Sequence, residues 1–176
     1  MNHSKPFLVP LIFLAAVPIL LGCATTKMES TLPPEASAHQ FERVMVIVAI
    51  IPAEARELGE ATFAEESTDG TTFIPSYPFL TLGVKHDESE IAEILESHEV
   101  DAVLRLSLTG QGYDGSGTAR SPNARFEAEM REVEDWVVVW SSTSKTMGNV
   151  VADRDDLLRS LARKTVEQLS EDGLIY

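Results

Sequence analysis

The chain has 176 residues, of which 28 are Asp or Glu and 14 are Lys or Arg, so its formal net charge is −14 at pH 7. A surface this acidic repels nucleic acid and anionic lipid head groups, which argues against a nucleic-acid-binding protein. The single cysteine argues against disulfides and against metal sites built from several cysteines. The length suits one domain with a short additional segment.

The first 22 residues are predicted to be a secretory signal peptide. Lys5 precedes the apolar run FLVPLIFLAAVPILL, which is too short and too interrupted by proline to span a bilayer comfortably as a helix. The run leads into LLGC, in which Cys23 directly follows a small residue. This tetrapeptide resembles the lipobox of bacterial lipoproteins. The resemblance implies cleavage before Cys23 and attachment of diacylglycerol and an acyl chain, such as palmitate, to that residue.

Lipidation of Cys23 predicts a stable attachment to a membrane, because each buried methylene contributes about 0.8 kcal/mol and several chains are present. In proteobacterial lipoproteins an aspartate after the cysteine usually signals retention in the inner membrane. This chain has Ala24 there. For a proteobacterial host we therefore expect an outer-membrane lipoprotein whose domain faces the periplasm.

Residues 23–40 are predicted to be a flexible tether. The stretch ATTKMESTLPPEASAH is small, polar and proline-bearing, which is typical of a linker. A single α/β domain is then expected over residues 41–176.

The first half of this domain predicts alternating strands and helices. The run VMVIVAII at 44–51 is typical of a strand buried on both faces. Pro52 ends it and suits the first turn of a helix over 53–66. Residues 71–82 predict a short edge strand and a loop, because prolines interrupt them. Asp87 and Glu90 predict the capped start of a second helix, which ends near His98.

The second half predicts three more strands and a final helix. Apolar residues alternate with mostly polar ones over 100–109 and again over 125–131. WVVVWSS at 136–142 completes a hairpin with the preceding strand. Residues 153–170 have a helical apolar period, with Gly173 as the stop. The order β-α-β-α-β-β-β-α predicts an α/β fold with a mixed sheet of about five strands and helices packed on it.

Glycines at 110, 112 and 115 spell G-x-G-x-x-G, but the surrounding pattern argues against a nucleotide site. A dinucleotide-binding loop needs a helix directly after it, because the pyrophosphate binds the helix N-terminus. Here a strand follows. We therefore expect a flexible connection between strands and no cofactor. Tyr113 and Asp114 are the contact candidates in this loop.

Histidine and carboxylate patterns predict neither a metal site nor catalytic residues. His86 and His98 flank a predicted helix of about three turns and are too far apart for a shared metal. Glu54, Glu57 and Glu60 lie along the first helix, and a charged helix face is usually a solvated face. We therefore expect a non-enzymatic protein.

The hairpin carries the main candidate contact surface. A two-residue turn at Glu134-Asp135 places Glu129 opposite Trp140 and Arg131 opposite Val138. Aromatic, apolar and charged side chains would then share one face, which suits a protein contact. The candidates are Trp136, Val138, Trp140, Glu129 and Arg131. The alternative is that a helix covers the tryptophans, and a register change of one residue would exchange the two faces.

The chain resembles bacterial lipoproteins whose domain is similar to the N-terminal domain of TolB, a domain type also seen in the curli secretion lipoprotein CsgG. The matching stretches are VMVIVAI, IPSYPFL, EVDAVLRLSL, VVVW and the final helix. Arg56 and Tyr77 match recurrent positions, and we interpret them as structural: an arginine that ties helix to loop, and an aromatic that closes the edge of the core. The family usually has a glycine in the hairpin turn, where this chain has Glu134-Asp135.

These observations predict a non-enzymatic envelope lipoprotein whose domain binds another envelope protein or supports an assembly. The alternative is a domain that binds a small molecule or a glycan, or a weak hydrolase that uses carboxylates near the glycine loop. A deep polar pocket with converging carboxylates would favour the alternative. An exposed aromatic patch or an open sheet edge would favour protein binding.

Overall fold

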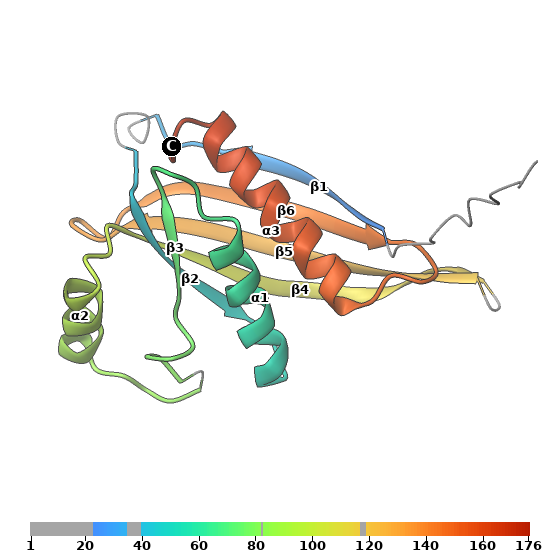
Figure 1. Cartoon of the computed structure of the whole chain (residues 1–176), viewed down its shortest axis with the longest axis horizontal. Coiled ribbons are helices and arrows are strands. Elements are labelled where there is room, and N and C mark those ends of the chain that lie inside the picture. Colours follow the sequence, from blue (N-terminus) through green and yellow to red (C-terminus); the bar gives the residue numbers. More distant parts are fainter. Residues whose placement is uncertain (1–22, 35–39, 82, 117–118) are drawn as a thin grey trace, which may run out of the picture.

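The computed structural model describes residues 23–34, 40–81, 83–116 and 119–176 (Figure 1). The predicted signal peptide, residues 1–22, lies outside the described residues. The described residues form a six-stranded mixed sheet and three helices, which confirms the predicted fold class. The predicted element order is also confirmed, with one additional strand at the start.

The sheet has the strand order β1-β6-β5-β4-β2-β3. β1, β6, β5 and β4 are antiparallel neighbours, whereas β4, β2 and β3 run parallel. The strands are β1 (Ala24–Thr31), β2 (Arg43–Ala49), β3 (Thr72–Pro75), β4 (Ala102–Ser116), β5 (Ala119–Glu132) and β6 (Val138–Gly148). The helices are α1 (Ala53–Glu65), α2 (Glu88–Ser97) and α3 (Arg154–Glu171).

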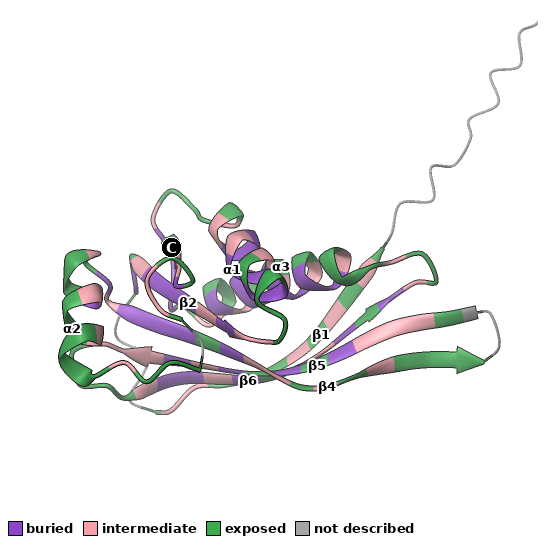
Figure 2. Cartoon of the chain, turned by 90° about the horizontal axis from the view of Figure 1, so that it is seen from below, coloured by how far each residue is buried: buried purple, intermediate pink, exposed green. Residues whose placement is uncertain are grey.

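The helices divide the sheet into a covered face and a largely open face. α1 and α3 lie side by side on the covered face, where they enclose the main core (Figures 1 and 2). α2 lies at one end of the molecule, and its Leu95 packs with Met45 and Val103 on the opposite face. β2 therefore has a helix on each side, which explains its uninterrupted apolar sequence.

A buried carboxylate joins β2, α1 and the loop after β3. The Glu60 side chain is fully buried. Its Oε1 accepts hydrogen bonds from Val48 N at 3.0 Å and from Arg56 Nε at 2.7 Å, and its Oε2 accepts one from Tyr77 N at 2.7 Å. The Ser76 hydroxyl lies 3.0 Å from both carboxylate oxygens and accepts from Arg56 Nη2 at 2.9 Å. Four donors thus compensate for removing the charge from water.

This network corrects one expectation and confirms another. Glu60 does not belong to a solvated face: it points into the domain, whereas Glu54 and Glu57 on the same helix are exposed. Arg56 ties α1 to the loop after β3, as expected. Periodicity cannot identify such a residue, because its burial depends on donors that come from three separate segments.

The predicted tether is wrong for residues 24–31, which form the edge strand β1. β1 pairs with β6 from Ala24 opposite Gly148 to Thr31 opposite Ser141. Its inner face packs on α3 through small polar groups: the Thr26 hydroxyl lies 2.9 Å from the hydroxyls of both Thr146 and Ser160. The inward-facing residues of this strand are Ala24, Thr26, Met28 and Ser30. With two small polar residues among four, the strand has only a weak apolar alternation, and its composition therefore resembles that of a linker.

The glycine-rich segment is also more regular than predicted. β4 and β5 remain paired as far as Ser116 opposite Ala119, so residues 110–116 extend a strand and do not form a loop. A bulge between Leu108 and Gly110 shifts the register within this hairpin. Pairing across the sheet supplies the order that the local sequence lacks.

We predict that Glu60→Ala lowers the free energy of unfolding by about 3–5 kcal/mol, because the guanidinium of Arg56 would stay buried without its partner. Urea denaturation followed by circular dichroism measures this change. The matched control is Glu57→Ala on the exposed side of the same helix, with an expected change within about 0.5 kcal/mol. Equal effects of the two substitutions would contradict the proposed importance of the buried carboxylate.

Candidate functional site

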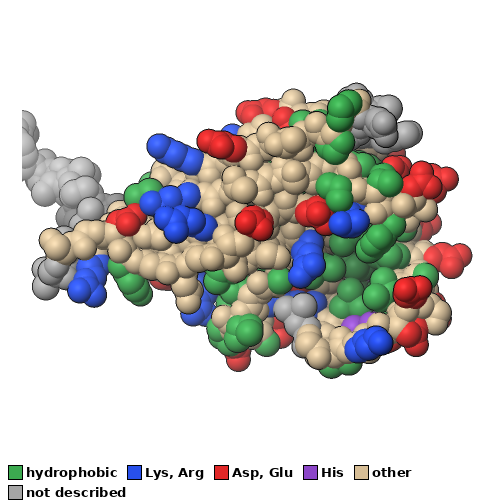
Figure 3. All heavy atoms as spheres, turned by 180° about the vertical axis from the view of Figure 1, so that it is seen from behind, with side chains coloured by type: hydrophobic (Ala, Val, Ile, Leu, Met, Phe, Trp, Pro, Cys, Tyr) green, Lys and Arg blue, Asp and Glu red, His purple; other side chains and the backbone are tan. Residues whose placement is uncertain are grey.

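The open face of the sheet changes from polar to apolar along its width. Figure 3 shows this face: charged side chains are spread over the strands, and hydrophobic side chains gather around a hollow on the α2 side. Three hollows adjoin one another here. Arg105 and Glu129 line both the first and the second, and Ile91, Leu95 and Trp136 line both the second and the third.

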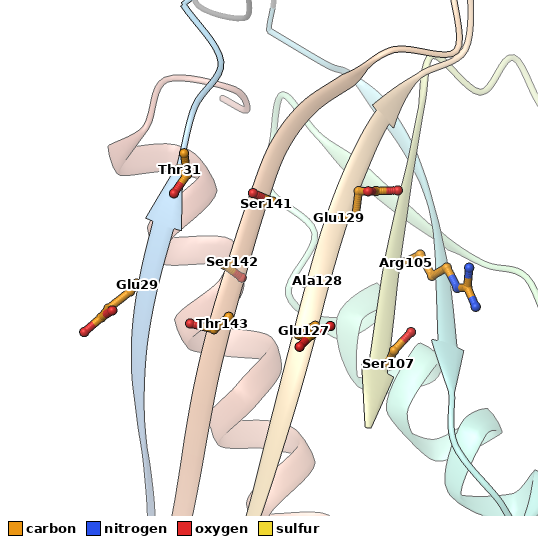
Figure 4. Close-up of a pocket in the computed structure, with 10 residues that line it drawn as sticks. All are labelled: Glu29, Thr31, Arg105, Ser107, Glu127, Ala128, Glu129, Ser141, Ser142 and Thr143. Carbon is orange, nitrogen blue, oxygen red and sulfur yellow. The ribbon is translucent and has the colours of Figure 1, made fainter. Parts of the chain in front are cut away.

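The polar part lies across β1, β6, β5 and β4 (Figure 4). Alternating residues of four strands line a shallow hollow of about 430 Å³. We call it the polar face; the side chains that project on it are Glu29, Thr31, Arg105, Ser107, Glu127, Glu129, Ser141 and Thr143. A sheet face with this composition is stable in contact with water and needs no covering helix.

The apolar part lies between α2 and the β5–β6 turn. Ile91 and Leu95 form one wall, Val133 and Trp136 form the other, and the hollow measures about 760 Å³. We call it the α2 groove; its lining residues are Glu88, Ile91, Ala92, Leu95, Glu96, Glu99, Val100, Val133 and Trp136. The neighbouring hollow of about 390 Å³ continues it onto Met45, Ile47 and Val103 of the sheet. This is the strongest candidate site for a partner, because apolar surface remains open there.

Trp136 is held in the α2 groove by a strained backbone and by an arginine. Its φ angle is +57°, a left-handed conformation that costs a bulky residue about 1–3 kcal/mol. Arg131 Nη1 donates to the Trp136 carbonyl at 3.1 Å, and Arg131 Nε donates to Glu129 Oε1 at 2.7 Å. The Trp136 side chain stays 48% exposed. Glu129, Arg131 and Trp136 thus lie close together, although Glu129 pairs with Ser141 and not with Trp140 as predicted.

The predicted hairpin register is wrong beyond Arg131. Arg131 pairs with Val138 as expected, but the next pair is Met130 with Trp140, so Val139 has no partner. This bulge turns Trp140 to the covered face, where it is fully buried and its Nε1 donates to Asp172 Oδ2 at 2.7 Å. Trp140 is therefore not part of a contact surface, and Val138 is only half-buried beside it. Sequence alternation cannot reveal one inserted residue.

The rim of the α2 groove is acidic. Glu88, Glu96 and Glu99 line it, and all three are exposed. Arg43 Nε approaches Glu99 Oε2 at 4.0 Å, a weak contact. Among the described residues that line this hollow there is no Lys or Arg. The site therefore combines an apolar floor with negative charge at its edge.

Tyr113 and Asp114 lie on the β4–β5 hairpin. Tyr113 is 68% exposed, and Asp114 Oδ2 accepts from Lys145 Nζ at 3.2 Å. The hairpin base and the start of α3 line another hollow, of about 690 Å³. Asp153 lines it, but that carboxylate caps α3 and accepts from Asp156 N at 3.1 Å. The converging carboxylates that would favour a hydrolase are not found among the described residues of this hollow.

His86 and His98 have structural contacts. His86 Nε2 accepts from Thr81 N at 3.2 Å. The ring of His98 packs on that of Phe79, with 4.1 Å between the two ring centroids. Within the ranges that the structure describes, no three His, Cys, Asp or Glu side chains gather in a way that suits a metal ion.

The amino-terminal end of the described chain is fixed to the sheet. Cys23 is exposed, and its carbonyl accepts from Asn149 N at 3.0 Å. β1 begins at the next residue, at the end of the molecule opposite α2 (Figures 1 and 2). Of the described helices, none has the length and apolar character needed to cross a membrane.

Comparisons with known proteins indicate a shared fold. No family model matches the chain, and no curated protein matches its sequence. Two structures of the PelC dodecamer from Paraburkholderia phytofirmans align over 85% and 86% of this chain and over 98% and 100% of theirs, with TM-scores of 0.56 and 0.54. Their sequence identities are 19% and 18%. The chain therefore has the PelC fold.

A weaker alignment joins the chain to lipoprotein GNA1162 from Neisseria meningitidis, with a TM-score of 0.46 and 18% identity over 74% of this chain and 99% of that one. The more specific resemblance to TolB and CsgG stays a prediction.

The helix beside the α2 groove depends on a cap that titrates. Asp87 Oδ1 accepts from the Ser89 hydroxyl at 2.7 Å and from Glu90 N at 2.8 Å. These bonds, first the one from Ser89, hold the pKa of the Asp87 carboxyl below its usual value.

We predict that acid loosens the start of α2. A carboxyl whose pKa is lower in the folded state stabilises the fold above its unfolded pKa, and this contribution is lost as the pH falls through the folded pKa. Amide exchange of residues 88–91 should therefore accelerate relative to α3 as the pH falls through that range. Asp87→Asn is the control, because asparagine caps a helix without titrating. An acid response that the asparagine variant retains would place its cause elsewhere.

Proposed function

We propose that this protein is a non-enzymatic lipoprotein of the cell envelope whose α/β domain binds another protein through the α2 groove. The observation that carries this proposal is the exposed Trp136 above an open apolar hollow. Tryptophan is among the residue types most enriched at the energetic centres of protein interfaces. Its strained and hydrogen-bonded backbone is consistent with a side chain kept in place for contact.

The position of the lipobox cysteine supports this arrangement. Because β1 starts at Ala24, acyl chains on Cys23 would attach to the rigid sheet with no tether between them. Helix α2, which forms one wall of the α2 groove, lies at the other end of the molecule (Figure 1). A lipidated chain would thus hold the groove away from the bilayer, where a protein in the periplasm can reach it. Outer-membrane sorting rests on Ala24 and remains part of the proposal.

Similarity in fold gives a second, more general line of support. PelC is solved as a dodecamer, so this fold can build an assembly from many copies. An assembly role needs no catalytic residue, which agrees with the expectation from the sequence. The polar face supports the alternative of a small polar ligand or glycan, because hydroxyl and charged side chains are its main lining.

We predict that the wild-type chain incorporates labelled palmitate and that Cys23→Ser abolishes both labelling and membrane retention. A hydroxyl in place of the thiol cannot form the thioether that anchors a bacterial lipoprotein. Cell fractionation after metabolic labelling measures both properties. A Lys27→Ala chain, altered on an exposed side of β1, serves as the control and should behave as the wild type. Membrane retention of the serine variant would overturn the proposed anchor.

We predict that a photoreactive residue in place of Trp136 gives a discrete protein adduct in intact cells. The control places the same residue at Arg163, an exposed position of α3 on the opposite side of the sheet. Gel analysis and mass spectrometry identify the adduct. Equal adducts at both positions would indicate nonspecific contact, and no adduct at Trp136 in a folded, lipidated chain would reject the groove as the interaction site.

A further inference from the structure

We propose that the α2 groove recognises a peptide segment in which a large apolar side chain is flanked by Lys or Arg. The inference rests on the proposed function, because it assigns the chemistry of the partner at the same site. The occupant is a basic segment of another protein. Its apolar side chain would lie against Trp136 and Leu95, and its cations would face the glutamates of the rim.

The hollow has the size and lining of a binding site for a side chain. Its volume of about 760 Å³ falls within the range of about 300–1,000 Å³ that is usual for ligand pockets. Ile91, Leu95, Val100 and Val133 supply aliphatic surface on the walls. The Trp136 ring adds a large flat surface that loses little conformational freedom on binding, because a tryptophan side chain has few rotatable bonds. Arg131 also holds the backbone at this residue.

The charges around the hollow favour a partner segment with Lys or Arg beside its apolar side chain. Glu88, Glu96 and Glu99 line it, and Glu90 and Glu93 lie exposed on the same helix. Of the nearby cations, Arg131 is held by Glu129 at 2.7 Å, and Arg43 lies 4.0 Å from Glu99. Arg105 lines only the adjoining hollows. Negative potential therefore remains for a partner to complement, and opposite charge at a rim directs association and excludes the wrong partner.

The same charges argue against two other occupants. A second copy of this chain carries a formal charge of −14, so it would bring further negative charge to an acidic rim. An anionic lipid surface would be repelled for the same reason. A basic segment is the occupant whose charge and apolar side chain both fit.

The test compares two synthetic peptides of about twelve residues, a length sufficient to cross one pocket. Both have leucine at the same positions, and all remaining positions are lysine in one peptide and glutamate in the other. Calorimetry with the full-length protein in detergent measures the dissociation constants. We expect the lysine peptide to bind and the glutamate peptide not to bind. Trp136→Ala should weaken binding of the lysine peptide by about tenfold or more, in the range of an interface hot spot.

A charge reversal distinguishes binding of the lysine peptide at the α2 groove from its nonspecific attraction to an acidic protein. In Glu96→Lys with Glu99→Lys, preference should move to the glutamate peptide. The control reverses Glu54 and Glu57 on α1, which changes the net charge equally and should leave the lysine peptide's affinity within about twofold, because distant exposed charges are screened. Circular dichroism checks that every variant is folded. Equal losses in the two double variants, or no effect of Trp136→Ala, would overturn the proposal.

The outcomes also separate this inference from the proposed function. A discrete adduct at position 136 in cells, together with no discrimination between the peptides, would keep protein binding and reject the basic segment. If neither an adduct at position 136 nor binding of the lysine peptide is observed, both the proposed function and this inference are rejected. Trp136-dependent dimerisation in sedimentation, without peptide binding, would assign the groove to a second copy and also overturn the inference.

Discussion

The buried Glu60 carboxylate is the interaction on which the arrangement of this domain depends. It joins β2, α1 and the loop after β3 through donors from Val48, Arg56, Ser76 and Tyr77. A buried charge is stable only when its hydrogen-bonding capacity is met, so these segments must meet at one point. The contact with Glu60 therefore fixes the position of β2, and β2 carries Met45 and Ile47 on its other face. The network therefore also fixes the sheet surface beside the α2 groove.

The open face follows from the distribution of polar and apolar residues over the strands. Part of this face is apolar, because β2 and β4 present Met45, Ile47 and Val103 there. Contact of these side chains with water is unfavourable, and α2 covers them in part. From Arg105 towards β1 the same face is charged or hydroxylated and remains in contact with water. The α2 groove lies at this boundary. Trp136 remains exposed there because the left-handed turn and Arg131 direct it away from the core in which Trp140 is buried.

The long antiparallel strands set the distance between the two ends of the molecule. At about 3.3 Å per residue, the 11 residues of β6 separate Gly148, beside the chain start, from the β5–β6 turn by roughly 35 Å. Under the proposed lipidation, this rigid separation performs the role that the sequence suggests for a tether. It would hold the proposed interaction surface at a fixed height above the bilayer without a flexible linker.

The sequence by itself determined the α/β class, the order of the elements from β2 to α3 and the extents of the three helices, because these depend on local periodicity, proline and caps. It also assigned Trp136, Glu129 and Arg131 to one candidate surface of the hairpin, although the register that it predicted for Glu129 was wrong. Only the tertiary structure decided that 24–31 is a strand, since its half-buried face mixes small polar residues with apolar ones and gains its partners from β6 and α3. The bulge at Val139, the burial of Glu60 and the separation of the two tryptophans likewise depend on contacts between distant segments. Such contacts leave no period in the local sequence.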